Sequence, residues 1–117
     1  MSRIGFLTSL KRHDSPLSPH FGKAKWLMVV DSEQQTRFVQ NTGLDGRSVV
    51  HLLRDQGCDE VVFSNIGEGA LRQLMQSGIS GWYAPDDVPV PRLLEMLNVG
   101  QLRLARKATS ERGNHAR

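Results

Sequence analysis

A long polar loop near the start of the chain holds the side chains most able to do chemistry. Residues 8–22 combine two prolines with small and polar residues, namely His13, Asp14, Ser15, Ser18, His20 and Gly22. Loops of this length inside a small domain are more often functional than idle. Because imidazole is a common metal ligand and Lys11, Arg12 and Lys23 stand nearby in the sequence, the loop is expected to receive an anionic ligand or a soft metal with open coordination.

A second candidate lies at Asn65-Ile-Gly-Glu-Gly, between a predicted strand and a predicted helix. The backbone N–H groups at a helix N-terminus attract anions, so Asn65 and Gly67 are expected to line an anion site. The alternative is a plain tight turn that lets the helix start close to its strand. The segment lacks the Lys-Ser/Thr ending of a nucleotide-binding Walker loop.

The histidines and the cysteine also have simpler structural interpretations. His20 could be a loop histidine bonded to a backbone carbonyl, and His13 could be a solvated surface group. His51 is expected on the exposed face of a helix. Cys58, the only cysteine, is interpreted as a small buried thiol at the opposite edge of the sheet from His20. The sequence alone leaves open whether His13 or Cys58 takes part in binding.

Common catalytic motifs are missing from the sequence. No serine lies in a Gly-x-Ser-x-Gly elbow, and no His-Glu-x-x-His pattern occurs. A metal-dependent nuclease would need clustered carboxylates on central strands, and the predicted strands offer only Asp31 and Glu60 at their ends. The chain is therefore predicted to be a binding protein rather than an enzyme.

Hydrophobic patterning predicts the elements that must position these residues. Strands are expected at residues 4–7, 25–31, 36–40, 60–64 and 79–83, and helices at 47–56, 70–76 and 90–97. The short turn at 32–35 predicts a β-hairpin, and the helices between the later strands predict parallel pairing. The expected fold is α/β, with a mixed five-stranded sheet, one β-hairpin and flanking helices.

This order of elements brings several loops to one edge of the sheet. If the first, fourth and fifth strands are parallel, the loops at their carboxyl ends share this edge, and these are residues 8–22, 65–69 and 84–89. Ligands of open α/β sheets bind at that edge. The edge is therefore expected to hold the binding site.

Length, cysteine count and hydropathy restrict the class of protein. The 117 residues are close to one ordinary domain, which is expected to span residues 1–102, with residues 103–117 as a basic C-terminal tail that is expected to be disordered. Residues 101–107 are expected to add a helical turn. A single cysteine excludes a disulfide scaffold, and the longest apolar run, Trp26 to Val30, is far short of the ~20 residues of a membrane span. The chain starts without a signal-peptide pattern, so a cytoplasmic location is expected.

The net charge of +3 is unevenly distributed. Residues 1–30 and 100–117 are basic, whereas residues 31–99 hold five basic and ten acidic side chains. The aromatic residues do not alternate with Lys or Arg as a stacking platform for nucleic acid requires. Specific nucleic-acid binding is therefore not expected, and the basic tail is interpreted as an aid to solubility or to weak contact with polyanions.

The segment Ser18-Pro19-His20-Phe21-Gly22-Lys23-Ala24, with the strand that ends at Asp31, resembles a known family. This is the nitrogenase iron–molybdenum cofactor biosynthesis family, which includes NifX-like proteins, the core domain of NafY and the C-terminal part of NifB. The likeness continues through the hairpin, Cys58-Asp59-Glu60-Val61-Val62, Ile66-Gly67 and Gly78-Ile79, and covers Ile4 to Leu102. The His-Phe-Gly step is specific, and the rest is mostly scaffold pattern.

The resemblance implies a ribonuclease-H-like three-layer fold and a non-catalytic carrier of an iron–sulfur or iron–molybdenum type cofactor or its precursor. It makes His20 the candidate metal ligand, with Ser18, Phe21 and Gly22 beside it. A carrier needs only one or two protein ligands, because the cluster brings its own sulfides and must be released. Implied partners are the metallocluster and cofactor-biosynthesis proteins, with the chain as a monomer or as a homodimer that could supply a second His20. The alternative is a small-anion or protein-interaction domain of the same fold with no role in metalloclusters.

Overall fold

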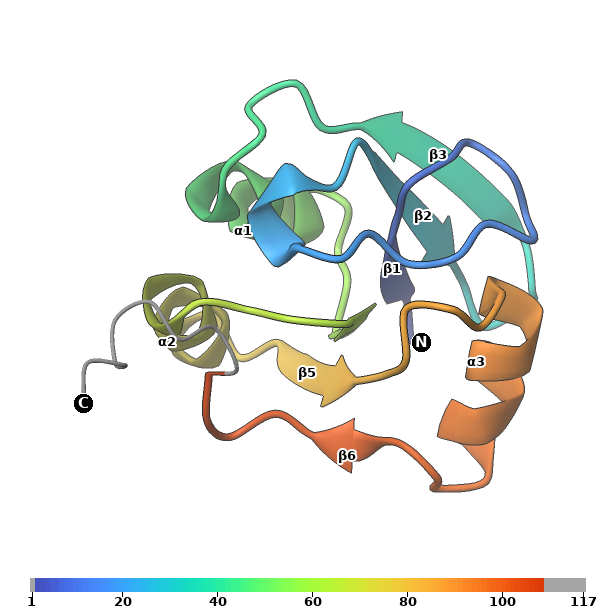
Figure 1. Cartoon of the computed structure of the whole chain (residues 1–117). Helices are drawn as coiled ribbons and strands as arrows, with labels where there is room; N and C mark the ends of the chain where they lie inside the picture. The colour runs from blue at the N-terminus through green and yellow to red at the C-terminus, as the bar shows by residue number, and fades with distance from the viewer. Residues whose placement is uncertain (1, 109–117) are drawn as a thin grey trace.

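A computed structural model describes residues 2–108 of the chain. The elements follow one another in the order β1 (Ile4–Thr8), η1 (Phe21–Lys23), β2 (Trp26–Val30), β3 (Thr36–Gln40), α1 (Gly46–Asp55), β4 (Glu60–Phe63), α2 (Glu68–Gln76), β5 (Ser80–Tyr83), α3 (Val90–Asn98) and β6 (Arg103–Leu104). Figure 1 shows α1 and α2 on one side of the sheet and α3 on the other. Within the described range, no helix is both long enough and apolar enough to cross a membrane.

The strands form one mixed sheet in the order β3-β2-β1-β4-β5-β6. β2 pairs antiparallel with both β1 and β3, so the predicted hairpin is confirmed. β4 lies between β1 and β5 and is parallel to both, as expected. The two successive antiparallel steps also turn β3 into the direction of β1. The chain therefore leaves β3 at the same edge of the sheet at which it leaves β1.

The sheet of the described residues has six strands, not the five that the sequence predicts. The helical turn predicted at residues 101–107 is wrong, because Arg103–Leu104 forms β6 antiparallel to β5. The Ala105 N–H donates to the Gly81 carbonyl at 2.7 Å, and Leu102 and Ala105 are buried. Alternation over so few residues does not distinguish a strand from a turn of helix. The sheet thus continues beyond residue 102, and residues 109–117 of the predicted tail lie outside the described residues.

Successive strand residues point to opposite faces of the sheet and build two cores. The core beneath α1 and α2 contains alternate strand residues, among them Leu7, Leu27, Val29, Val61 and Phe63. The core beneath α3 contains the residues between them, among them Phe6, Met28, Val30 and Val62. Helices therefore cover both faces, as expected for a three-layer α/β fold, while the ribonuclease-H-like assignment stays a prediction.

The ends of the helices follow from their capping residues. The Asp45 carboxylate accepts the Ser48 N–H at 2.8 Å and caps α1. Gly57 follows the helix at φ +72°, a left-handed conformation that glycine adopts without a Cβ clash. α2 begins at Glu68, two residues earlier than predicted, and includes Gly69 in its first turn. A side-chain cap thus marks the start of α1, and both α1 and α2 begin at the edge where β3 and β4 end.

Candidate functional site

A pocket of about 490 Å³ lies at the edge of the sheet where β1, β3, β4 and β5 end. Its walls come from the end of the first loop, the start of α1 and the β4–α2 turn, and consist of His20, Phe21, Gly22, Lys23, Asp45, Gly46, Asn65, Ile66, Gly67 and Ala70. The structure thus brings together all the predicted cofactor-binding residues except Ser18, which lies just behind His20. That they bind a cofactor stays a prediction.

The first loop is anchored to β1 by its own residues. Leu17 forms an antiparallel bridge with Thr8 and is 1% exposed. The Ser18 N–H donates to the Leu7 carbonyl at 2.8 Å, and the Ser18 hydroxyl donates to the His20 carbonyl at 3.0 Å. Ser18 is buried, so its part in the site is to fix the backbone of His20.

The His20 imidazole is exposed at the rim of the pocket. Its backbone is held by Ser18 and by the Lys23 N–H, which donates to the His20 carbonyl at 3.2 Å. No hydrogen bond to the imidazole ring is found among residues 2–108. The interpretation of His20 as a carbonyl-bonded loop histidine therefore does not describe this structure. An imidazole presented in this way is able to bind a metal that arrives from solvent.

Phe21 and Asn65 tie the first loop to the β4–α2 turn. The Phe21 N–H donates to the Asn65 carbonyl at 3.0 Å, and the Asn65 side-chain amide donates to the Pro19 carbonyl at 2.9 Å. The buried Phe21 ring lies edge-on to Phe63, with their ring centroids 5.4 Å apart. The Asn65 amide, a predicted anion contact, therefore holds the loop that carries His20.

Two glycines allow η1, α1 and α2 to converge on the pocket. A Cβ on Gly22 would lie 2.7 Å from the Gly46 nitrogen, and a Cβ on Gly46 would lie 2.9 Å from the Ala70 Cβ. Real Cβ atoms essentially never come within 3.0 Å of such atoms. A side chain at Gly22 would therefore push η1 away from the start of α1.

Two helix N-termini make the pocket attractive to anions. The first N–H groups of α1 and α2 have no partner within their helices and carry partial positive charge. Gly67, the N-cap of α2, has no side chain that could cap this end. Lys23 adds a full positive charge. Asp45 is the acidic residue of the lining, and the backbone hydrogen bond from Ser48 lowers the pKa of its carboxyl.

The side chains of the pocket suit a preformed metal cluster better than a bare metal ion. Residues 2–108 contain no group of three or more His, Cys, Asp or Glu side chains that could hold a metal ion. A bare ion that needs a full protein cage does not fit His20 and its neighbours. A sulfide-bearing cluster does, because it brings its own ligands and needs few from the protein, while Lys23 and the backbone N–H groups suit its negative charge.

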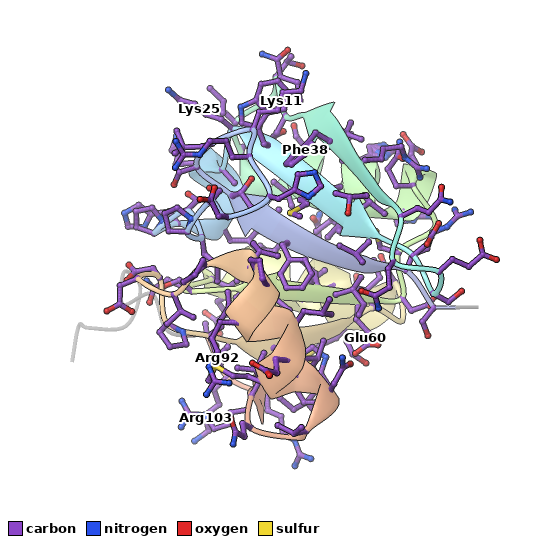
Figure 2. All side chains as sticks on the ribbon, turned by 90° about the vertical axis from the view of Figure 1, so that its right-hand side faces the viewer. Lys11, Lys25, Phe38, Glu60, Arg92 and Arg103 are labelled. Atoms are coloured by element: carbon purple, nitrogen blue, oxygen red, sulfur yellow. The ribbon has the colours of Figure 1, made fainter. Side chains whose placement is uncertain are left out.

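Lys11 and His13 pack over strands β2 and β3 instead of the pocket. The Lys11 ammonium lies 5.2 Å from the centroid of the Trp26 ring. The His13 ring is edge-on to Phe38, at 5.6 Å between centroids. Figure 2 shows Lys11 and Phe38 on the same part of the surface, toward β3. The exposed His13 is a surface group, as the simpler interpretation holds.

Two other predicted contributors also lie away from the pocket. Arg12 forms an exposed ion pair with Asp14 at 3.1 Å. The loop at 84–89 contributes no residue to the described lining. Where it leads into α3, the Val90 N–H donates to the Ser15 carbonyl at 3.3 Å. The third loop therefore supports the first loop rather than the pocket.

The carboxylates at the strand ends have structural partners at the opposite edge. Asp31 accepts the N–H groups of Glu33 and Gln35 at 2.9 and 3.0 Å and so shapes the hairpin turn. Glu60 accepts the Trp82 indole N–H at 2.9 Å. Neither carboxylate is brought to the pocket.

Cys58 lies just before β4, also at the edge opposite the pocket, and is 6% exposed. The interpretation as a small buried thiol is confirmed. Burial, helped by the neighbouring charge of Asp59, raises the pKa of the Cys58 thiol to about 11.

Cys58 is expected to resist thiol reagents in the folded protein, because only the thiolate reacts and the pKa is raised from 9.0 to about 11. Labelling near pH 8 should be roughly 100-fold slower than in urea-unfolded protein. The raised pKa also means that the contribution of Cys58 to stability is full below pH 9.0 and is lost as the pH rises through about 11. Equal labelling rates in folded and unfolded protein would contradict this assignment.

Sequence reasoning missed the contribution of α1 to the pocket. Asp45 and Gly46 line it, although no prediction placed them there. The signal was present in the hairpin, since the strand at 36–40 returns to the direction of the first strand. The loop that follows it must then emerge at the edge that holds His20.

Comparison with known proteins places the chain among cofactor-associated proteins. The dinitrogenase iron-molybdenum cofactor family matches residues 5–100. Among curated proteins, no relative matches the chain. The apo form of the orange protein from Desulfovibrio gigas is similar in structure, with a TM-score of 0.87, 22% identity, and coverage of 94% of this chain and 98% of that one.

Two further solved structures share the fold. A Thermotoga protein assigned as NifB has a TM-score of 0.83 and 24% identity, over 95% of this chain and 99% of that one. A protein from Methanocaldococcus jannaschii assigned as a dinitrogenase has a TM-score of 0.68 and 16% identity, over 90% and 95% of the two chains. These likenesses show a common fold. The family match at residues 5–100 includes every residue that lines the pocket, and the chain belongs to the dinitrogenase iron-molybdenum cofactor family.

Proposed function

We propose that this chain is a non-catalytic carrier that holds an iron–sulfur or iron–molybdenum type cluster, or its precursor, as cargo in the carboxyl-edge pocket. The observation that carries the proposal is the exposed His20 imidazole at the rim of a pocket that also presents Lys23 and two helix N-termini. Membership of a family that is named after the cofactor of dinitrogenase supports it.

Four residues in or beside the pocket have distinct parts in holding such a cargo. His20 provides the protein's metal ligand. Lys23 and the first N–H groups of α2, whose N-terminus has no side-chain cap, offset the negative charge of the cluster. Ser18 and Asn65 hold the loop so that His20 faces the pocket before the cargo arrives.

The small number of protein ligands suits transport. A cluster held by one imidazole can leave when an acceptor offers more or softer ligands, whereas a closed cage would retain it. Cofactor-biosynthesis proteins would act as donor and acceptor. In a homodimer, two copies of His20 could share one cluster, and a ratio of one cluster to two chains would report this.

Anaerobic reconstitution with iron, sulfide and molybdate tests the proposal. The wild-type protein is expected to take up a chromophore in a fixed ratio to chain, read by visible absorption. His20→Ala is expected to reduce this uptake about tenfold or more, the equivalent of losing at least 1.4 kcal/mol of binding free energy. His51→Ala is the matched control, because His51 is also exposed but lies on α1 outside the pocket lining.

The same experiment separates the carrier from its alternative. Uptake that is equal in wild-type protein, His20→Ala and His51→Ala would overturn the carrier proposal, as would a folded wild-type protein that takes up nothing. Binding of molybdate or phosphate alone, unaffected by His20→Ala, would instead favour a small-anion domain that uses Lys23 and the helix N-termini.

A further inference from the structure

A second hollow, separate from the pocket, lies between α1 and α2. Its volume is about 460 Å³, and it is lined mainly by Arg47, His51 and Arg54 from α1 and by Gln73, Gln76 and Ser77 from α2. We name it the α1–α2 groove. The two helices lie on the same side of the sheet (Figure 1), so the groove opens on the outer surface of that layer.

The basic side chains of the groove form a row. Arg47, His51 and Arg54 are spaced by four and three residues, which places them on one face of the helix. At 1.5 Å per residue, the row extends for about 10 Å. A small ion is best held by groups that converge on one point, whereas a row of this length matches an extended ligand with several negative charges.

No acidic side chain balances the row from within the groove. The described lining contains neither Asp nor Glu, and the ion pairs found in residues 2–108 lie in the first loop and on α3. Arg47 stands in the first turn of α1, where the helix dipole disfavours a cation, and that turn has no acidic residue. Asp45, the N-cap of α1, interacts with the charge of Arg47 and offsets part of it, but Asp45 is not among the residues that line the groove.

The α2 wall of the groove indicates which class of ligand can form hydrogen bonds there. Gln73, Gln76 and Ser77 present amide and hydroxyl groups that both donate and accept hydrogen bonds. A peptide has backbone N–H donors and carbonyl acceptors that such groups can satisfy. The phosphate groups of a nucleic acid offer acceptors alone, so they would pair with the N–H and O–H groups of this wall but not with its amide carbonyl oxygens.

We propose that the α1–α2 groove binds an acidic segment of a partner protein. Its carboxylates lie against Arg47 and Arg54, which suit bidentate pairing, and its backbone lies against Gln73 and Gln76. Arg47 directly follows Gly46, a residue of the cargo pocket. A partner docked in the groove therefore lies next to the pocket. The proposal does not depend on what the pocket holds.

Fluorescence anisotropy with a fluorescein-labelled oligoglutamate peptide tests the proposal on the full chain without cargo. Wild-type protein is expected to bind the peptide saturably. The double variant Arg47→Gln/Arg54→Gln is expected to bind about tenfold more weakly or worse, because two charge-assisted contacts are lost. The double variant Arg103→Gln/Arg106→Gln removes the same charge beyond the groove and is expected to bind as the wild type does.

Three results would overturn the proposal. Equal weakening in both double variants would show a general attraction between opposite charges. Displacement of the peptide by inorganic phosphate would assign the groove to a small anion. Tighter binding of a single-stranded oligonucleotide of equal charge, lost in Arg47→Gln/Arg54→Gln, would assign it to nucleic acid. Because all four substituted arginines are exposed, circular dichroism is expected to show the same fold in both double variants.

Discussion

Replacing Phe63 by alanine is expected to lower the free energy of unfolding by about 3–5 kcal/mol. Phe63 is the last residue of β4 and is fully buried. Its ring meets Phe21 and Tyr83 edge-on, with centroids 5.4 and 5.3 Å away. The substitution leaves a cavity between these rings. It also removes the ring against which Phe21 packs, and Phe21 directly follows His20 in the first loop.

Urea unfolding followed by circular dichroism measures this loss. Met75→Ala is the control, since Met75 is 58% exposed and a surface change of this kind is expected to stay within about 0.5 kcal/mol. A Phe63→Ala variant as stable as Met75→Ala would show that the three rings do not form the contact described. Small domains have a total stability of roughly 5–15 kcal/mol, so the expected loss is a large share of it and is readily measured.

Gly22→Ala is expected to damage both the fold and the pocket. The new Cβ would lie 2.7 Å from the Gly46 nitrogen and 3.0 Å from the Asp45 carbonyl carbon. These are backbone atoms, so relief requires a shift of η1 or of the start of α1. The expected cost is about 1–3 kcal/mol of unfolding free energy, with a fall in cluster uptake because the wall of the pocket moves.

Gly69→Ala is the matched control for Gly22→Ala. A Cβ on Gly69 would meet no atom within 4 Å, and alanine is favoured over glycine in a helix by up to about 1 kcal/mol. Gly69→Ala is therefore expected to be as stable as the wild type or more stable, and to take up cargo normally. If urea unfolding gave the same stability for both variants, η1 would not approach α1 as closely as the structure shows.

The central strands could be predicted from sequence because burial on both faces leaves a continuous apolar run. Trp26 to Val30 is such a run, and the short polar turn after it predicts the hairpin. β6 could not be predicted in the same way. It has two residues at the edge of the sheet, and its assignment depends on pairing with β5, which no local pattern encodes.

Some residues of the candidate site could likewise be predicted from local sequence, and others depend on the tertiary structure. His20 and the turn at Asn65 could be found because polar and glycine-bearing segments follow buried strands. The place of Gly46 in the pocket lining could not be predicted from the residues around it. It depends on the direction of β3 and on close packing of the backbone. Lys11 was misleading as a neighbour in sequence, because its ammonium lies over the Trp26 ring on β2. His13 packs against Phe38 on β3 and is the surface group that the simpler interpretation expects.

The role of His20 as the cargo ligand is tested most simply by the metal content of folded protein after reconstitution, with wild-type protein and His20→Ala prepared side by side. The carrier proposal predicts that the wild-type protein retains iron, and molybdenum where the cluster contains it, in a fixed ratio to chain after desalting. His20→Ala is expected to retain almost none while unfolding at the same urea concentration. Equal metal content in the two proteins would contradict the claim that His20 holds the cargo.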